Sequence, residues 1–161
     1  MANVNRINEN DNRVVMIASP SSLVVEVGDI VCRAVAADVA DDATLVLNEA
    51  VTPERMVDAG LAAANRAAVA AQMVGIALDA SADGETEEIR VGYNGGFLLT
   101  QKTAAAIHIG DPVEVYADDT NAENQTVVEG ATSPIGICTK TKTSTTETQI
   151  EVLIQPALMN V

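Results

Sequence analysis

The sequence predicts a mainly β fold: an antiparallel β-sandwich or barrel with an internally duplicated β unit and one or two short inserted helices. Three observations support this prediction. From Val14 onward the chain consists of short apolar runs rich in β-branched residues. Turn residues separate these runs about every 8 to 12 positions, which is typical of sandwiches and barrels. Two segments of the chain repeat each other, and one alanine-rich segment interrupts the β pattern.

The chain begins with a polar segment. Five of its first twelve residues are asparagine, and little in this stretch could join a core. We therefore expect residues 1–13 to form a flexible N-terminal arm. Residues 14–161 are expected to form a single β-rich domain, because a chain of about this length buries roughly two thirds of its unfolded surface. The start lacks the apolar core of a secretory signal, and we expect a soluble chain made inside the cell.

The repeated segments are MVGIALDASADGETEEIRVGY (residues 73–93) and PIGICTKTKTSTTETQIEVLI (residues 134–154). They align without a gap at an offset of 61 residues, which places Gly136 at the position of Gly75. Two such half-structures can cover each other's apolar faces. We therefore predict that the segments fold as equivalent hairpins within pseudo-repeats of about residues 23–93 and 105–154.

A Gly-Asp pair precedes each repeated segment, in VEVGD and again in IHIGD. Gly28 and Gly110 can adopt a positive φ without steric cost, and the aspartate that follows each can bond nearby backbone. Each pair therefore predicts a tight turn between antiparallel strands. Pro112 lacks an N–H donor and is suited to the first position of a strand.

The first pseudo-repeat is 21 residues longer than the second between its Gly-Asp turn and the aligned glycine. The excess matches the alanine-rich stretch in length. Thr52 is a suitable N-cap, and Pro53 is suited to the first position of a helix. The segment LAAANRAAVAAQM contains seven alanines, the residue with the highest helix propensity. We predict a helical insertion over about residues 53–73.

Composition excludes several classes of function. The chain carries 23 acidic and 9 basic residues, a formal charge of −14, so a phosphate backbone would be repelled. With one Phe, two Tyr and no Trp it has almost no surface on which bases could stack. We expect no nucleic-acid partner and no membrane partner. Cys32 and Cys138 lie in apolar runs and are predicted to be reduced core residues.

No catalytic constellation is predicted. His108 is the only histidine, and because it alternates with Ile107 and Ile109 it should point to solvent while they face a buried side. Without a second histidine or a Gly-x-Ser-x-Gly motif, neither a catalytic triad nor a histidine metal cluster can form. The stretch GYNGG at residues 92–96 lacks the spacing of a nucleotide-binding loop.

Three acidic stretches are predicted to be solvated turns, with calcium binding as the alternative. They are ADVADD (Asp38, Asp41, Asp42), DASADGETEE (Asp79, Asp83, Glu85) and ADDTNAEN (Asp118, Asp119, Glu123). None matches the twelve-residue calcium loop with its glycine and terminal glutamate. We therefore predict no catalytic, cofactor-binding or metal-binding residues, no cofactor and no enzymatic activity.

The order of the motifs resembles the small capsid decoration, or cement, proteins of tailed bacteriophages. The similarity covers about residues 61–154 and rests on LAAANRAAVAAQMVGIALDAS, YNGGFLL, TAAAIHIGDPVEV, SPIGICTKT and a late IEVLI. The resemblance implies a β-rich structural protein of the virion. Such a protein sits on the outer surface of an assembled capsid, commonly as a homotrimer, and clamps copies of the major capsid protein together.

Two other functions stay open at this point. One is a phage tail or fibre accessory, or another carbohydrate- or cell-surface-binding β module, although sugar sites favour exposed aromatic residues. The other is a small trimeric β hydrolase whose carboxylates bind magnesium. The absence of any catalytic motif places this enzyme last.

Overall fold

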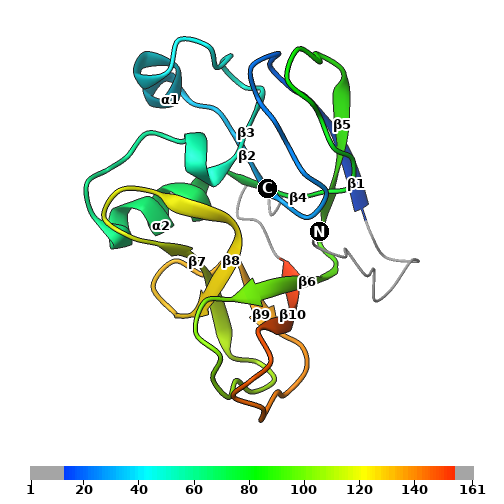
Figure 1. Ribbon diagram of the computed structural model, residues 1–161, viewed down its shortest axis with the longest axis vertical. Coiled ribbons are helices and arrows are strands. Elements are labelled where there is room, and N and C mark those ends of the chain that lie inside the picture. The colour runs from blue at the N-terminus through cyan, green and yellow to red at the C-terminus, as the bar shows by residue number, and fades with distance from the viewer. Residues whose placement is uncertain (1–12, 155–161) are drawn as a thin grey trace.

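The computed structural model describes residues 13–154, which form two five-stranded sheets and three short helical elements (Figure 1). This confirms the predicted mainly β fold. One sheet has the strand order β1-β5-β4-β2-β3, and the other closes into a barrel in the order β10-β6-β8-β7-β9. We call them the open unit and the closed unit. The elements are β1 (Arg13–Ala18), β2 (Ile30–Arg33), α1 (Ala36–Asp41), β3 (Ala50–Val51), η1 (Pro53–Arg55), α2 (Ala62–Gln72), β4 (Met73–Ala77), β5 (Glu88–Tyr93), β6 (Gly96–Gln101), β7 (Pro112–Ala117), β8 (Ala122–Glu129), β9 (Gly136–Cys138) and β10 (Gln149–Ile154).

The two hairpins predicted to be equivalent have the same register. In the open unit β4 pairs with β5, and in the closed unit β9 pairs with β10, both antiparallel. Adding the offset of 61 to each partner in the first hairpin gives a pair of the second. The pairs are Ile76↔Gly92 with Ile137↔Leu153, and Ala77↔Val91 with Cys138↔Val152. The predicted duplication of the β unit is therefore confirmed.

The equivalence extends to strands whose repetition the sequence alignment did not include. β1 pairs with β5 in the same register as β6 pairs with β10. The offset is 82 residues between β1 and β6 and 61 residues between β5 and β10. The corresponding pairs are Val15↔Val91 with Phe97↔Val152, and Ile17↔Ile89 with Leu99↔Ile150. Each unit is therefore built on the same plan, in which its first strand lies beside its last.

The Gly-Asp turns also match. Gly28 and Gly110 have φ angles of 102° and 90°, as the turn prediction requires. The carboxylate of Asp29 accepts a hydrogen bond from the Glu26 N–H at 2.8 Å, and Asp111 accepts one from the His108 N–H at 2.7 Å. In both turns a carboxylate thus fixes the backbone three residues before it.

The units differ in whether the last gap between strands is closed. In the closed unit the eight-residue β8 reaches the outer edge of β6 and pairs with it in parallel at Thr100 and Gln101. Next to these pairs the Lys102 N–H donates to the Val127 carbonyl at 2.9 Å. In the open unit β3 has two residues, and among the described strands it pairs with β2 alone. Pro20 stands at the position of Lys102 and has no N–H to donate.

The larger of two hydrophobic clusters is shared by the two units. Its 22 buried residues come from both units and from α2, and they include both cysteines, which are free as predicted. A second cluster of nine buried residues lies in the open unit alone. There Leu23, at 1% exposure, occupies the position of Ala105 in the closed unit. Leu23 therefore adds apolar volume to the unit that lacks the closing strand.

Helical structure lies mainly in the predicted insertion. Thr52 and Pro53 start η1, although the Thr52 side chain makes no capping bond, and α2 packs against β7. The six-residue α1 was not predicted, and it replaces the loop expected at ADVADD. The division into an arm and one domain stays a prediction. Residues 1–12 lie outside the described residues, and Arg13, assigned to the arm, begins β1.

Candidate functional site

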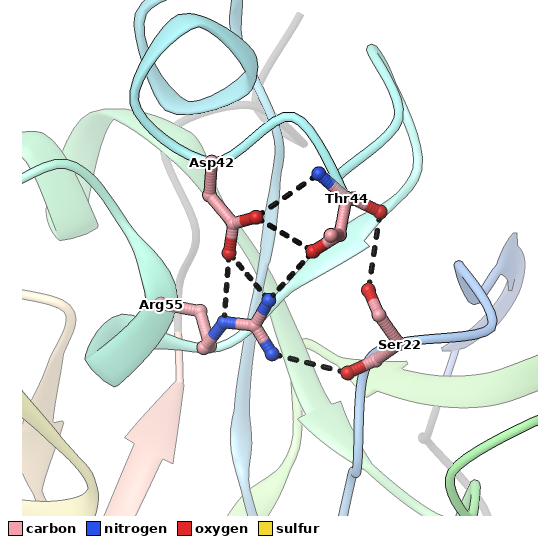
Figure 2. Close-up of polar contacts among 4 residues, drawn as sticks. All are labelled: Ser22, Asp42, Thr44 and Arg55. Carbon is pink, nitrogen blue, oxygen red and sulfur yellow. Dashed lines mark hydrogen bonds and ion pairs between the residues drawn. The ribbon is translucent and has the colours of Figure 1, made fainter.

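The acidic residues of the ADVADD stretch have structural partners. Asp38 is fully buried, and its carboxylate accepts hydrogen bonds from the N–H groups of Val35 and Val57, each at 2.9 Å. It therefore fixes the start of α1 and the chain after η1. Asp42 belongs to a polar cluster instead (Figure 2).

Figure 2 shows this cluster, in which Arg55 joins three segments of the open unit. Its guanidinium donates to Asp42, to the Ser22 carbonyl at 3.0 Å and to the Thr44 hydroxyl at 3.0 Å. The Ser22 hydroxyl in turn donates to the Thr44 carbonyl at 3.1 Å. The hydrogen bond from Thr44, followed by those from Arg55, lowers the pKa of Asp42 to about 2. The cluster connects the loop after β1 to the loops before and after β3.

In the second acidic stretch Asp79 forms a two-point ion pair with Arg90, with donor–acceptor distances of 2.9 and 2.7 Å. These bonds lower the pKa of Asp79. Glu85 accepts from the Ala82 N–H at 2.8 Å. Asp83 is exposed. The stretch is therefore a turn held by its own chain, and its outer residues face solvent.

In the third acidic stretch Asp118 accepts from the N–H and hydroxyl of Thr120, which lowers its pKa to about 2. Asp119 accepts from the Ala62 N–H at 3.1 Å, at the first residue of α2. Glu123 pairs with Lys102. Within residues 13–154 no three His, Cys, Asp or Glu side chains are placed to hold a metal ion together. The expectation that the chain has no catalytic, cofactor-binding or metal-binding residues stays a prediction.

His108 points to solvent as predicted, with its side chain 69% exposed and Nδ1 3.5 Å from the Asp111 carboxylate. The prediction that both neighbouring isoleucines face a buried side was wrong for Ile109. Ile107 is fully buried, but Ile109 is 68% exposed. The alternation stops at Ile107 because the chain turns at Gly110. In the part of the chain that the structure describes, no helix is long and apolar enough to cross a membrane.

A groove of about 380 Å³ lies beside the loop between β9 and β10. It is lined by Leu98, residues 140–144, Glu147 and residues 149–151. Lys142 is 9% exposed, and its Nζ donates to Gln101 Oε1 and to the Glu147 carbonyl, both at 2.6 Å. No aromatic residue lines the groove, so it provides no stacking platform for a sugar ring.

Exposed large apolar side chains gather in the open unit and its connections. Seven of the eight in the described residues precede residue 94, and Ile109 is the exception. The seven are Val14, Met16, Val24, Val27, Val46, Leu47 and Leu61. Such side chains are normal when scattered singly and mark a binding site when they lie together, as Val14 and Met16 do on one face of β1. The open unit is therefore the candidate binding face.

The outer edge of β1 is the most specific feature of this face. Arg90 of β5 directs its N–H to Asp79 and its carbonyl to Leu78, on the side of β4. Because successive residues of a strand point in opposite directions, Ile89 and Val91 must bond β1. By the observed register their partners are Ile17 and Val15. The N–H and carbonyl groups of Val14, Met16 and Ala18 therefore point to the outer edge, where no described strand pairs with them.

Two buried hydroxyls at the end of this edge have no hydrogen-bond partner among the described residues. They belong to Ser19 and Ser81, which are 1% and 3% exposed. The closed unit has Gln101 and Lys142 at these positions, where they bond to each other. The open unit therefore has two buried hydroxyl groups without a described partner at the position where β8 pairs with β6 in the closed unit. Pro20 was the sequence signal for this difference, but it has meaning only once the register is known.

The described residues form one closed and one open copy of the same β unit, an arrangement suited to a structural or binding protein. A protein-family model described as "phage cement protein" matches residues 37–154. The chain therefore belongs to the phage cement protein family, as its motif order suggested. No curated protein matches the chain significantly. Membership indicates a structural phage protein with a capsid-stabilising role. The matched range begins after β1 and β2.

Proposed function

We propose that this protein binds the outer surface of an assembled phage capsid as a homotrimer and stabilises contacts between copies of the major capsid protein. The observation that carries the proposal is the family match over residues 37–154. A protein with this task works by binding and needs no chemical step. We therefore propose that it is not an enzyme, binds no cofactor, and acts in the virion after synthesis in the host cytoplasm.

The shared core supports this role. Side chains from both units and from α2 pack in one apolar cluster, so the units resist movement relative to each other. A protein that stabilises a shell by bridging subunits must transmit force between its contact points. Three copies around a symmetry axis would also raise avidity, because each bound copy holds the others close to their sites.

Reconstitution tests the proposal. Phage particles stripped of this protein are incubated with the purified chain, and binding is measured by cosedimentation. We expect saturable binding and a higher temperature for release of packaged DNA. Light scattering should give the mass of a trimer for the free chain. The control is Thr143→Ala, an exposed position in the closed unit, which should bind as the wild type does. Failure to bind, or binding without a change in DNA release, would refute the stabilising role.

A further inference from the structure

We propose that the outer edge of β1 is a strand-accepting site, and that it pairs with one extended segment of the capsid subunit. The segment has apolar residues at alternate positions and Lys or Arg beside them. This inference rests on the proposed function, because it names the surface through which the protein holds the capsid.

The backbone of β1 provides the first argument. Val14, Met16 and Ala18 each direct one donor and one acceptor outward, so an added strand gains a row of hydrogen bonds without any rearrangement. An unpaired edge of this kind is a template for strand addition, and proteins usually protect it with charge, proline or a covering segment. On β1 the residues at the centre of the edge are Val14 and Met16, which are neither charged nor proline.

The side chains of β1 provide the second argument. Val14 and Met16 are 41% and 48% exposed, and they lie on the opposite face of the strand from Ile17, which is buried. The residues that offer backbone bonds are therefore the same ones that offer apolar surface. A strand with apolar residues at alternate positions would cover this surface while completing the ladder.

Within residues 13–154 the open unit has no segment that closes this edge as β8 closes the other unit. The closing contact of the other unit needs the N–H of Lys102, and Pro20 removes the corresponding donor. Beside this point the hydroxyls of Ser19 and Ser81 are buried without a partner. Both hydroxyls are enclosed, and they show that the open unit lacks the polar pair that Gln101 and Lys142 form in the closed unit.

Charge decides between possible occupants. Glu88 is exposed and lies opposite Ala18 in the ladder. The Gly84 N–H donates to the Ser21 carbonyl at 2.7 Å, which brings the acidic loop of Asp83 next to the end of β1. These carboxylates attract Lys or Arg. A second copy of the chain would bring few such cations to this edge, because the chain has 9 basic residues against 23 acidic ones.

The test uses Met16→Pro on stripped capsids. Because the Met16 N–H points outward, proline removes one outer donor and leaves the bonds to β5 intact, as at other edge positions. Met16→Ala is the matched control: it removes the same apolar side chain and keeps the N–H. We expect Met16→Pro to bind capsids at least about tenfold more weakly than Met16→Ala, which corresponds to about 1.4 kcal/mol. Circular dichroism and thermal melting confirm that both variants fold.

Equal binding by the two variants would overturn the inference while leaving the proposed function intact, provided the wild type binds. If Met16→Pro does not fold, hydrogen exchange of the wild type decides. Peptides covering residues 13–18 should exchange more slowly on capsids than in the free protein. Unchanged exchange overturns the inference. Slow exchange already present in the free protein, increasing with its concentration, also overturns it, because the edge then pairs with a second copy.

Discussion

The equivalent close approaches at Gly75 and Gly136 yield a quantitative prediction. A Cβ atom added to Gly75 would lie 2.2 Å from the Gly92 carbonyl oxygen, and one on Gly136 would lie 2.3 Å from that of Leu153. Real Cβ atoms essentially never come closer than 3.0 Å, so alanine would have to move the strands apart by roughly 0.7–0.8 Å. Both obstacles are backbone atoms of the paired strand and cannot rotate away. We expect each Gly→Ala substitution to cost about 1–3 kcal/mol.

Thermal unfolding followed by circular dichroism measures this cost. In a chain of this size about 1 kcal/mol shifts the midpoint by roughly 2–4 °C, so both variants should melt about 2–12 °C below the wild type. Thr143→Ala lies in the same hairpin as Gly136 but is exposed, and it should change the free energy of unfolding by less than about 0.5 kcal/mol. The reasoning fails if Gly75→Ala lowers the midpoint and Gly136→Ala does not. The two hairpins would then not be under the same constraint.

Two further predictions concern the open unit. Leu23→Ala should lower the free energy of unfolding, measured in urea, by about 2–5 kcal/mol, because this side chain is 1% exposed. The control Ile109→Ala, at an exposed position, should change it by less than about 0.5 kcal/mol. Similar small effects of both substitutions would show that Leu23 fills no essential space. Burial raises the pKa of Asp29 above 3.8, so its contribution to stability is complete below that pH and is lost as pH rises through the folded value. Relative to Asp29→Asn, which cannot ionise, the wild type should lose stability as the pH rises above 3.8, and parallel pH profiles would contradict this.

The sequence predicted the repeated hairpin correctly because short β-branched runs and a glycine under steric constraint leave a pattern that survives divergence. Gly75 and Gly136 are aligned in the sequence because in each hairpin only glycine fits beside the carbonyl of the paired strand. The Gly-Asp turns were predictable for a similar reason. A positive φ at Gly28 and Gly110 and a carboxylate that fixes the turn are both local requirements.

What the sequence could not predict depends on contacts between distant segments. The repetition of β1 in β6 was invisible because Ile17 and Leu99 share only a buried position, not a motif. The helix α1 is stabilised by Asp38, whose carboxylate also accepts from Val57, and a pattern of acidic residues alone resembles a solvated loop. The free edge of β1 likewise becomes visible only when the register shows which strand the open unit lacks.

The asymmetry between the units links the proposed edge to a stabilising role. A segment bound at β1 would extend a sheet in which β5 and then β4 are the next strands. All five residues of β4 are buried, and Met73 and Ile76 belong to the core that the open unit shares with the closed one. Force applied at the edge would therefore pass through two backbone ladders into a tightly packed interior. A loop contact would lack this connection, because loops open at lower free-energy cost than core strands. An open unit mounted on a closed one thus combines a free edge for a partner with a rigid support behind it.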